Sequence, residues 1–413
     1  MERYVFERNR KKILNQMEEG SVLLSFSTNK HLETHPDKFD VNRNYYYVSG
    51  VFEYENIVML VKGHNNKTNE IIFINPYDEL KAKWVGAPLS PEEIYEISGI
   101  TDVRNLENFD STLTTVLASF NKLYLDIEAN ENLDEPPYYE ALFAERITKR
   151  LPYVKILNGR ALFQHARTIK EPEEIEEMKK AIEITNKGII NILKHMGPQM
   201  EYQLESYFDQ AVKYYGGTGY SFPTIAASGA NSCCLHYSFN NSMAEDGDLI
   251  LFDLGASLNC YCADISRTFP VNGKFTPRQR QIYNIVLNGQ KLIFDNAKPG
   301  ITTRGLNQIL RDYYKEELYK IGLIKEKTEE EVSKYYYHGC SHHIGIDCHD
   351  LCDYTPLQAG SIISNEPGLY IAEEGIGIRI EDDILITEDG AEWLSPQIIK
   401  EPDEIEKFIE ENK

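Results

Sequence analysis

The fold of this chain is decided by residues 249–269, which read LILFDLGASLNCYCADISRTF. Two runs rich in apolar, β-branched and aromatic residues, 249–254 and 260–269, flank a short turn-like segment and predict a β-hairpin. Asp253 and Asp264 lie 11 positions apart, so a two-residue loop midway between them would place both carboxylates opposite each other on one face.

Two carboxylates about 4 Å apart repel by roughly 4 kcal/mol at an effective dielectric of 20. A carboxylate in an apolar strand also loses its hydration. A bound cation would relieve both problems. A protonated carboxyl group or a shifted register would relieve them too, so this hairpin alone leaves both readings open.

The chain repeats the pattern further along. Residues 369–371 and 377–380 flank the sequence AEEG at 372–375, which is a second hairpin signal. Glu366 and Glu381 lie 15 positions apart, and the register of this hairpin again places two acids opposite each other. Two such pairs predict a dinuclear metal site with four carboxylates.

A histidine-rich segment, HGCSHHIGIDCHD at 338–350, lies between the two hairpins and holds four of the ten histidines. Any one of them alone is better explained as a loop residue, but this position favours at least one as a metal ligand. Such an oxygen-rich set suits Mn²⁺, with Co²⁺ or Fe²⁺ as alternatives, better than a closed Cys/His zinc site. His236 follows a glycine turn at 228–231 and is weaker evidence of function.

Composition bounds the class of protein. The chain has 413 residues, 42% of them hydrophobic and 26% charged, which allows two soluble globular domains. Its net charge of −22 argues against nucleic acid or an anionic membrane as a partner. Neither a secretory leader nor a long apolar run is evident, so we expect a cytoplasmic protein. The seven cysteines show no C-x-x-C pair, which favours free thiols over a zinc site.

Two domains are expected, an α/β unit at 1–165 and an α+β unit at 166–413. Strands alternating with helices indicate the first class, and helices alternating with antiparallel hairpins the second. In the first unit we predict strands at 42–50, 56–61, 71–74 and 123–125 and a helix at 138–149, with His31, His35 and His64 in solvated loops. In the second unit we predict helices from Pro172, from Thr276 to about Lys298, from Thr303, and within 401–413.

These motifs together resemble the pita-bread metallopeptidase family, which includes aminopeptidase P, prolidase, methionine aminopeptidase and creatinase. The matching segments are ASG at 227–229, LHY at 235–237, DLG at 253–255, ADISRTF at 263–269, HGCSH at 338–342, HD at 349–350, EPGLY at 366–370 and GIRIED at 377–382. The stretch 267–281, which begins RTFPVNGKFT, is especially similar to bacterial aminopeptidase P. The first half resembles the creatinase-type N-terminal domain more loosely, which argues against the shorter methionine aminopeptidases.

The resemblance implies two divalent ions, with Mn²⁺ favoured and Co²⁺, Fe²⁺ or Zn²⁺ as alternatives. Five metal ligands carry over: Asp253, Asp264, His342, Glu366 and Glu381. Asp264 and Glu381 would bridge both ions, Asp253 would complete one, and His342 with Glu366 the other. His236, His338 and His349 would line the substrate site, and Arg379 would support a ligand or contact substrate. Trp84 resembles a tryptophan that reaches a neighbouring subunit's site in oligomeric relatives. Members of the family often form dimers or tetramers, so the resemblance also implies an oligomer.

The implied reaction is hydrolysis of the N-terminal Xaa-Pro bond of a peptide by a metal-bridging hydroxide. A metal ion with His236 or His349 would stabilise the oxyanion, and Glu366 would pass the proton to the proline nitrogen. The alternative within the class is an Xaa-Pro dipeptidase, or prolidase, which would share all five ligands. From other classes, a non-catalytic peptide-binding module and the metal-free creatinase are disfavoured, because every ligand position carries the expected residue.

Overall fold

The computed structural model describes residues 1–28, 40–128, 138–353 and 355–412. His31 and His35 lie outside these residues. The chain divides into two compact units, Met1–Ala166 and Arg167–Lys413. None of the helices in the described part of the chain is long and apolar enough to cross a membrane.

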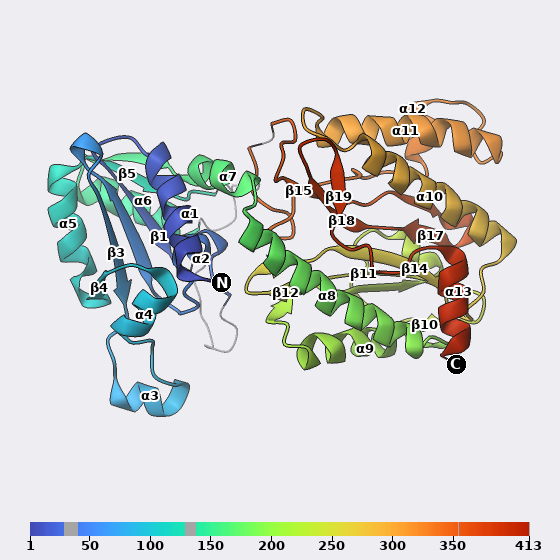
Figure 1. Cartoon of the computed structure of the whole chain (residues 1–413), viewed down its shortest axis with the longest axis horizontal. Coiled ribbons are helices and arrows are strands. Elements are labelled where there is room, and N and C mark those ends of the chain that lie inside the picture. The colour runs from blue at the N-terminus through green and yellow to red at the C-terminus, as the bar shows by residue number, and fades with distance from the viewer. Residues whose placement is uncertain (29–39, 129–137, 354, 413) are drawn as a thin grey trace. The chain divides into compact units, whose positions relative to one another are not determined.

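The first unit is built on one mixed sheet of six strands in the order β4-β3-β2-β1-β5-β6 (Figure 1). The strands are β1 (Ser21–Phe26), β2 (Ile57–Lys62), β3 (Thr68–Ile74), β4 (Asp102–Asn105), β5 (Lys122–Leu125) and β6 (Lys155–Asn158). The pairs β1–β2 and β2–β3 are antiparallel, and the other three are parallel. Every residue of β1 and β2 is buried, because these central strands are covered on both faces.

Helices alternate with these strands and confirm the predicted α/β class. They are α1 (Arg3–Gln16), α2 (Arg43–Ser49), α3 (Glu79–Val85), α4 (Pro91–Ser98), α5 (Phe109–Ser119), α6 (Tyr139–Arg150) and α7 (Arg160–Thr168). α3 has no buried residue and projects away from the sheet (Figure 1). α5 and α6 pack Leu113, Leu117 and Phe143 against the apolar side chains of β1 to β3. The strands predicted at 56–61, 71–74 and 123–125 are β2, β3 and β5, and the predicted helix is α6. His64 is exposed, as expected.

The strand predicted at 42–50 is wrong, because these residues form α2. The side chain of Asn42 accepts hydrogen bonds from the backbone N–H groups of Asn44 and Tyr45, which starts a helix. Gly50 ends the helix in the left-handed conformation, with φ of 69°. The two caps, together with burial of the tyrosines between them, override the β-propensity of the run.

The second unit pairs short antiparallel sheets with long helices and confirms the α+β class (Figure 1). Its helices are α8 (Pro172–Lys194), α9 (Glu201–Tyr214), α10 (Pro277–Asn296), α11 (Thr303–Lys320), α12 (Glu329–Ser333) and α13 (Pro402–Glu411). Its strands are β7 (Gln199–Met200), β8 (Gly219–Tyr220), β9 (Ile225–Ser228), β10 (Met243–Ala244), β11 (Leu249–Leu254), β12 (Ala256–Leu258), β13 (Tyr261–Cys262), β14 (Ile265–Pro270), β15 (Ile362–Asn365), β16 (Gly368–Ile371), β17 (Ile376–Arg379), β18 (Asp382–Ile386) and β19 (Ala391–Trp393). α8 and α9 contact β12, β13 and β9, whereas α10 contacts β15, β16 and β17. The four predicted helices are α8, α10, α11 and α13.

The register predicted for the first hairpin is wrong. We expected Asp253 opposite Asp264, but Asp253 pairs with Ser266 in the β11–β14 ladder. The loop consists of Asn259 and Cys260, one position later than expected, and both have positive φ, 50° and 67°. Positive φ at both loop residues is what a type I′ turn requires. The late turn moves every cross-strand partner by two residues and keeps the same side chains on each face.

The register predicted for the second hairpin is confirmed. Gly368 pairs with Arg379 in the β16–β17 ladder, and Asn365 pairs with Asp382 in the β15–β18 ladder. The same register runs through both ladders, so Glu366 and Glu381 lie opposite each other in the gap between them. Both acids therefore come from positions where one pair of strands ends and the next begins.

Candidate active site

One cavity of about 590 Å³ in the second unit collects every site residue predicted from the sequence. Its lining includes Asp253, Asp264, His342, Glu366, Glu381, His236, His338, His349 and Arg379. These residues come from the first hairpin, the second hairpin, the histidine-rich segment and the loop after β9. The two hairpins therefore meet at one place, as their repeated acid pattern suggested.

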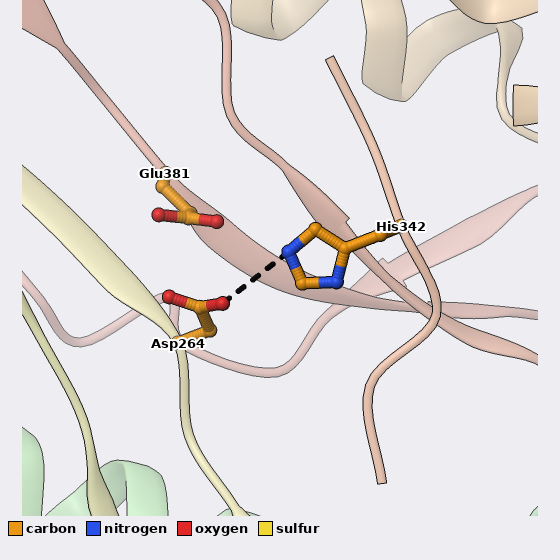
Figure 2. A group of neighbouring side chains, drawn as sticks. All are labelled: Asp264, His342 and Glu381. Carbon is orange, nitrogen blue, oxygen red and sulfur yellow. Dashed lines mark ion pairs between the residues drawn. The ribbon is translucent and has the colours of Figure 1, made fainter. Parts of the chain in front are cut away.

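Asp264, His342 and Glu381 form a group whose ligand atoms all lie within 4.8 Å of one another, which suits a metal ion (Figure 2). The Nε2 atom of His342 is 3.4 Å from Oδ2 of Asp264 and 3.6 Å from Oε1 of Glu366. Asp264 precedes β14 and Glu381 precedes β18, so two different strands point carboxylates at the same imidazole.

Asp253 is held beside this group by Arg379. Nη2 of Arg379 donates to Oδ2 of Asp253 at 2.6 Å, and Nε donates to the hydroxyl of Ser266 at 2.8 Å. That hydroxyl lies 2.7 Å from Oε2 of Glu381 and 3.1 Å from Oδ1 of Asp253. Nη1 of Arg379 reaches the phenol of Tyr370 at 3.0 Å. The guanidinium thus fixes one acid directly and a second through Ser266.

The acids carry more negative charge than their protein neighbours balance. Burial, together with the other three carboxylates, raises the pKa of Glu381 well above its usual value, although Arg379 opposes the shift. Burial also raises the pKa of Glu366 to about 7 and the pKa of Asp253, despite nearby positive groups. Divalent cations would supply the missing charge. The oxygen-rich group with one imidazole therefore fits the chemistry of a metal site.

Burial and the neighbouring charges shift the pKa values of three histidines in different directions. Burial lowers the pKa of an imidazole, but for His342 the hydrogen bond and charge of Asp264 outweigh it and raise the pKa to about 9. Burial and Arg379 lower the pKa of His338 to about 3. Burial and His342 lower the pKa of His349, whose ring stacks on that of His342 at 4.0 Å. His338 and His349 are therefore neutral at pH 7, whereas His342 is protonated when no cation is present.

Several lining residues were missed from the sequence. Cys348 lies in the cavity and its thiol donates to Oδ2 of Asp264 at 3.0 Å, although no cysteine was assigned to the site from the sequence. An apolar wall of Phe222, Pro223, Ile225 and Leu235 faces the acids. No local motif marks these side chains. The position of Cys348 between two predicted site histidines was the one available signal for it.

Two family models match the chain. Metallopeptidase family M24 matches residues 176–388, and the N-terminal domain of aminopeptidase P matches residues 6–124. The Xaa-Pro aminopeptidase of Escherichia coli is 31% identical over 436 aligned residues, covering 98% of both chains. The Xaa-Pro aminopeptidase of Haemophilus influenzae is 31% identical, covering 98% of this chain and 96% of the relative.

Solved structures agree with this assignment. A Bacillus anthracis structure, itself assigned only provisionally as an aminopeptidase P, superposes with a TM-score of 0.96 at 43% identity and covers 100% of this chain and 99% of its own. Aminopeptidase P from Escherichia coli with the inhibitor Pro-Leu superposes with a TM-score of 0.89 at 30% identity and the same coverage. The matches span both units and include the segments that build the cavity, and we conclude that this chain belongs to metallopeptidase family M24.

Proposed function

We propose that this protein is a metal-dependent exopeptidase that hydrolyses the N-terminal Xaa-Pro bond of peptides. The observation that carries the proposal is the convergence of four acids and four imidazoles on one cavity, in a family whose similar members are named Xaa-Pro aminopeptidases. Residues 1–165 form the N-terminal domain in this proposal, and residues 166–413 form the catalytic domain.

Five side chains are proposed to hold two divalent ions: Asp253, Asp264, His342, Glu366 and Glu381. Mn²⁺ is favoured because four of the five ligands offer carboxylate oxygen, which suits Mn²⁺ better than a thiolate-selecting ion. When bound, such ions would lower the pKa of a water molecule and polarise the scissile carbonyl group. His342 must lose its proton to bind an ion, so we expect metal binding to strengthen with rising pH.

The chain's own residues supply proton transfer and orientation. Glu366 is proposed to accept a proton on a carboxylate oxygen and to deliver it to the leaving proline nitrogen. Its Oε1 atom receives a hydrogen bond from Ser364 at 3.2 Å, which orients the carboxylate. His236 or His349 is proposed to donate an N–H group to the developing oxyanion.

His338 and Arg379 complete the proposed site. His338 contacts the phenol of Tyr370 at 2.8 Å, and that phenol also contacts Arg379. The pair therefore holds one side of the cavity through a shared tyrosine. The preference for proline has a physical basis, because an Xaa-Pro bond lacks the N–H that proteases reading an extended backbone use.

The test compares Gly-Pro with a longer Xaa-Pro-Xaa peptide, side by side, in protein stripped with chelator and then supplied with Mn²⁺. Release of the first residue from the longer peptide supports the aminopeptidase. Cleavage of Gly-Pro alone would make the protein a dipeptidase. Absence of metal-dependent cleavage of either peptide would reject the enzyme assignment and favour a non-catalytic binding module.

We also propose a cytoplasmic homo-oligomer, a dimer or a tetramer, with peptide as the partner rather than nucleic acid or membrane. On α3, Trp84 is 82% exposed and Leu80 is 69% exposed, with Tyr77 and Val85 exposed nearby. Large apolar side chains gathered in this way are typical of an interaction surface. Light scattering after size exclusion should show a particle larger than one chain, and Trp84→Ala together with Leu80→Ala should reduce its mass.

A further inference from the structure

A buried glutamate outside the metal cavity holds one wall of that cavity in place. Glu201 is the first residue of α9 and is 0% exposed. Its Oε1 atom accepts hydrogen bonds from the backbone N–H of Ser228 at 2.8 Å, the hydroxyl of Ser228 at 2.7 Å and the amide of Asn231 at 3.0 Å. Its Oε2 atom accepts from the phenol of Tyr237 and the backbone N–H of Ser242, both at 2.8 Å.

All five donors are neutral groups, and in the described part of the chain no lysine, arginine or histidine forms an ion pair with Glu201. A carboxylate buried without a cation is tolerated only when its lone pairs are well satisfied. The position of Glu201 at the start of a helix adds the favourable field of the α9 N-terminus. The carboxylate is therefore a stable anchor for the segments that donate to it.

Those donors belong to one continuous segment that forms a wall of the cavity. Ser228 is the last residue of β9, and Ser242 lies just before β10. Glu201 therefore accepts hydrogen bonds from both ends of the segment 228–242. Between them, Leu235, His236 and Ser238 line the cavity. Near the middle of the segment, the phenol of Tyr237, the immediate neighbour of His236, donates to Oε2 of Glu201.

The same anchor is linked to the metal ligands through the sheet. β9 pairs with β11, and Ile225 of β9 lies opposite Asp253 of β11. Asp253 in turn is held by Arg379. A carboxylate that fixes the end of β9 and the loop carrying His236 therefore sets the position of that imidazole relative to the acids.

We propose that Glu201 is a positioning residue, which holds the His236 imidazole in the active-site cavity through the phenol of Tyr237. This inference rests on the proposed function, because it assigns Glu201 a role through a residue of that site. Glutamine should not replace Glu201. Each carboxylate oxygen already meets at least two donors, so either orientation of the amide sets its NH₂ group against them.

Glu201→Gln would disrupt several hydrogen bonds to the segment 228–242 at once, so the decisive variant is Tyr237→Phe. It removes one hydroxyl group and leaves Oε2 of Glu201 bonded to Ser242. We expect kcat for an Xaa-Pro-Xaa peptide to fall about ten-fold with KM nearly unchanged, because the loop keeps its ends but loses its central tie. Tm should fall modestly, since the buried carboxylate keeps four of its five donors. Tyr283→Phe is the matched control, since its phenol is also buried and donates to the carbonyl of Lys400, away from the cavity.

A double-mutant cycle separates positioning from a general structural effect. In a His236→Ala background, Tyr237→Phe should cause no further loss of kcat, because the group it positions is absent. Additive losses in the two backgrounds would overturn the inference. Mn²⁺ affinity measured by calorimetry should be the same with and without the Tyr237 hydroxyl.

A spectroscopic measurement tests the inference without using activity. In ¹⁵N-histidine-labelled protein, the His236 imidazole signal is identified by its loss in His236→Ala. This signal should shift in Tyr237→Phe and stay in place in Tyr283→Phe. An inactive wild-type protein would reject the proposed function, whereas an unmoved His236 signal would reject the positioning role of Glu201.

Discussion

Glu381 and Asp382 are consecutive residues, both buried, and their surroundings shift their pKa values in opposite directions. Burial and three neighbouring acids raise the pKa of Glu381 well above its usual value. Burial also acts on Asp382, but Arg267 and Lys400 outweigh it and lower the pKa. Alternation along the strand turns the two carboxylates to opposite faces, and each face offers a different partner.

On the side of the strand that carries Asp382, the protein itself supplies the positive charge that balances the carboxylate. Nη2 of Arg267 and Nζ of Lys400 lie 2.7 and 2.6 Å from its oxygens, and Ser395 and Gln290 donate as well. The face of Glu381 offers a serine hydroxyl and an arginine shared with Asp253. A buried acid with its own cation has a structural role, whereas a buried group of acids without enough cations marks the place where the protein takes a metal from solution.

The largest expected effect comes from removing the charge of Glu381. Glu381→Gln should weaken Mn²⁺ binding and lower kcat/KM about 1,000-fold or more, equivalent to roughly 4 kcal/mol in transition-state stabilisation. Without metal, the variant should be as stable as the native protein or more stable, because it loses a poorly compensated buried charge. Calorimetric titration with Mn²⁺ and urea unfolding in chelator measure the two parts.

Glu388→Gln is the control for Glu381→Gln, since Glu388 is exposed in the same part of the chain. The distinction between the compensated Asp382 and the uncompensated Glu381 would fail if Glu381→Gln strongly destabilised the metal-free protein. That result would mean that the protein itself compensates Glu381.

The reverse result is expected for its neighbour. Asp382→Asn leaves the wholly buried guanidinium of Arg267 without its acid, which should cost about 3 kcal/mol in the free energy of unfolding. Urea unfolding in chelator measures this loss, and Asp389→Asn at an exposed acid is the matched control. In the fraction that remains folded, Mn²⁺ affinity should be close to native. A large loss of affinity without a loss of stability would place Asp382 in the metal site and contradict the distinction.

The sequence was sufficient to bring the site residues together but not to set every register. For the second hairpin, Glu366 and Glu381 were paired correctly because the turn ends at Gly375, whose left-handed conformation suits glycine. For the first hairpin, the turn contains Cys260 at positive φ, which few non-glycine residues adopt and which no local pattern reveals. The error shifted the cross-strand partner of Asp253 by two positions but left Asp253 on the correct face of the hairpin.

Residues whose partners lie far away in the sequence were the ones missed. Asp382 looked like any acid at the end of a motif, because Arg267 and Lys400 approach it only after folding. Glu201 likewise meets Tyr237 from 36 positions away. Periodicity and motif spacing describe local geometry, and neither one predicts which buried acid will be paired.

The two faces should also give opposite dependences of stability on pH. The raised pKa of Glu366, about 7 against an ordinary 4.5, means that the folded metal-free protein binds the extra proton, so this group lowers stability as pH rises from about 4.5 to 7. His342, raised to about 9, stabilises fully below about 6.5, and its contribution is lost as pH rises to 9. The lowered pKa of Asp382 contributes stability above about pH 3.8, and this contribution is lost as pH falls below that value.

Urea unfolding between pH 3 and 9 in chelator should therefore show stability declining on both the acidic and the neutral side. Saturating Mn²⁺ should remove the decline on the neutral side, because the ions take the place of the bound protons. A Mn²⁺-independent profile would show that the acids around Glu381 hold no metal.

The smallest effect is expected from removing one of the two cations that balance the charge of Asp382. Lys400→Met keeps much of the side chain that covers Trp393, whose ring lies 3.7 Å from the ammonium group, and removes only the charge. Asp382 retains Arg267, Ser395 and Gln290, so the free energy of unfolding at pH 7 should fall by about 1 kcal/mol, well below the loss in Asp382→Asn. With one cation gone the pKa of Asp382 should rise, and the acid limb of the stability profile should move to higher pH.

Mn²⁺ affinity should be unchanged, because Lys400 compensates the acid on the other face of the strand. If Lys400→Met instead tightened or weakened Mn²⁺ binding as strongly as it changed stability, the two faces would share one electrostatic field, and the separation between the structural acid and the metal-binding acids would fail.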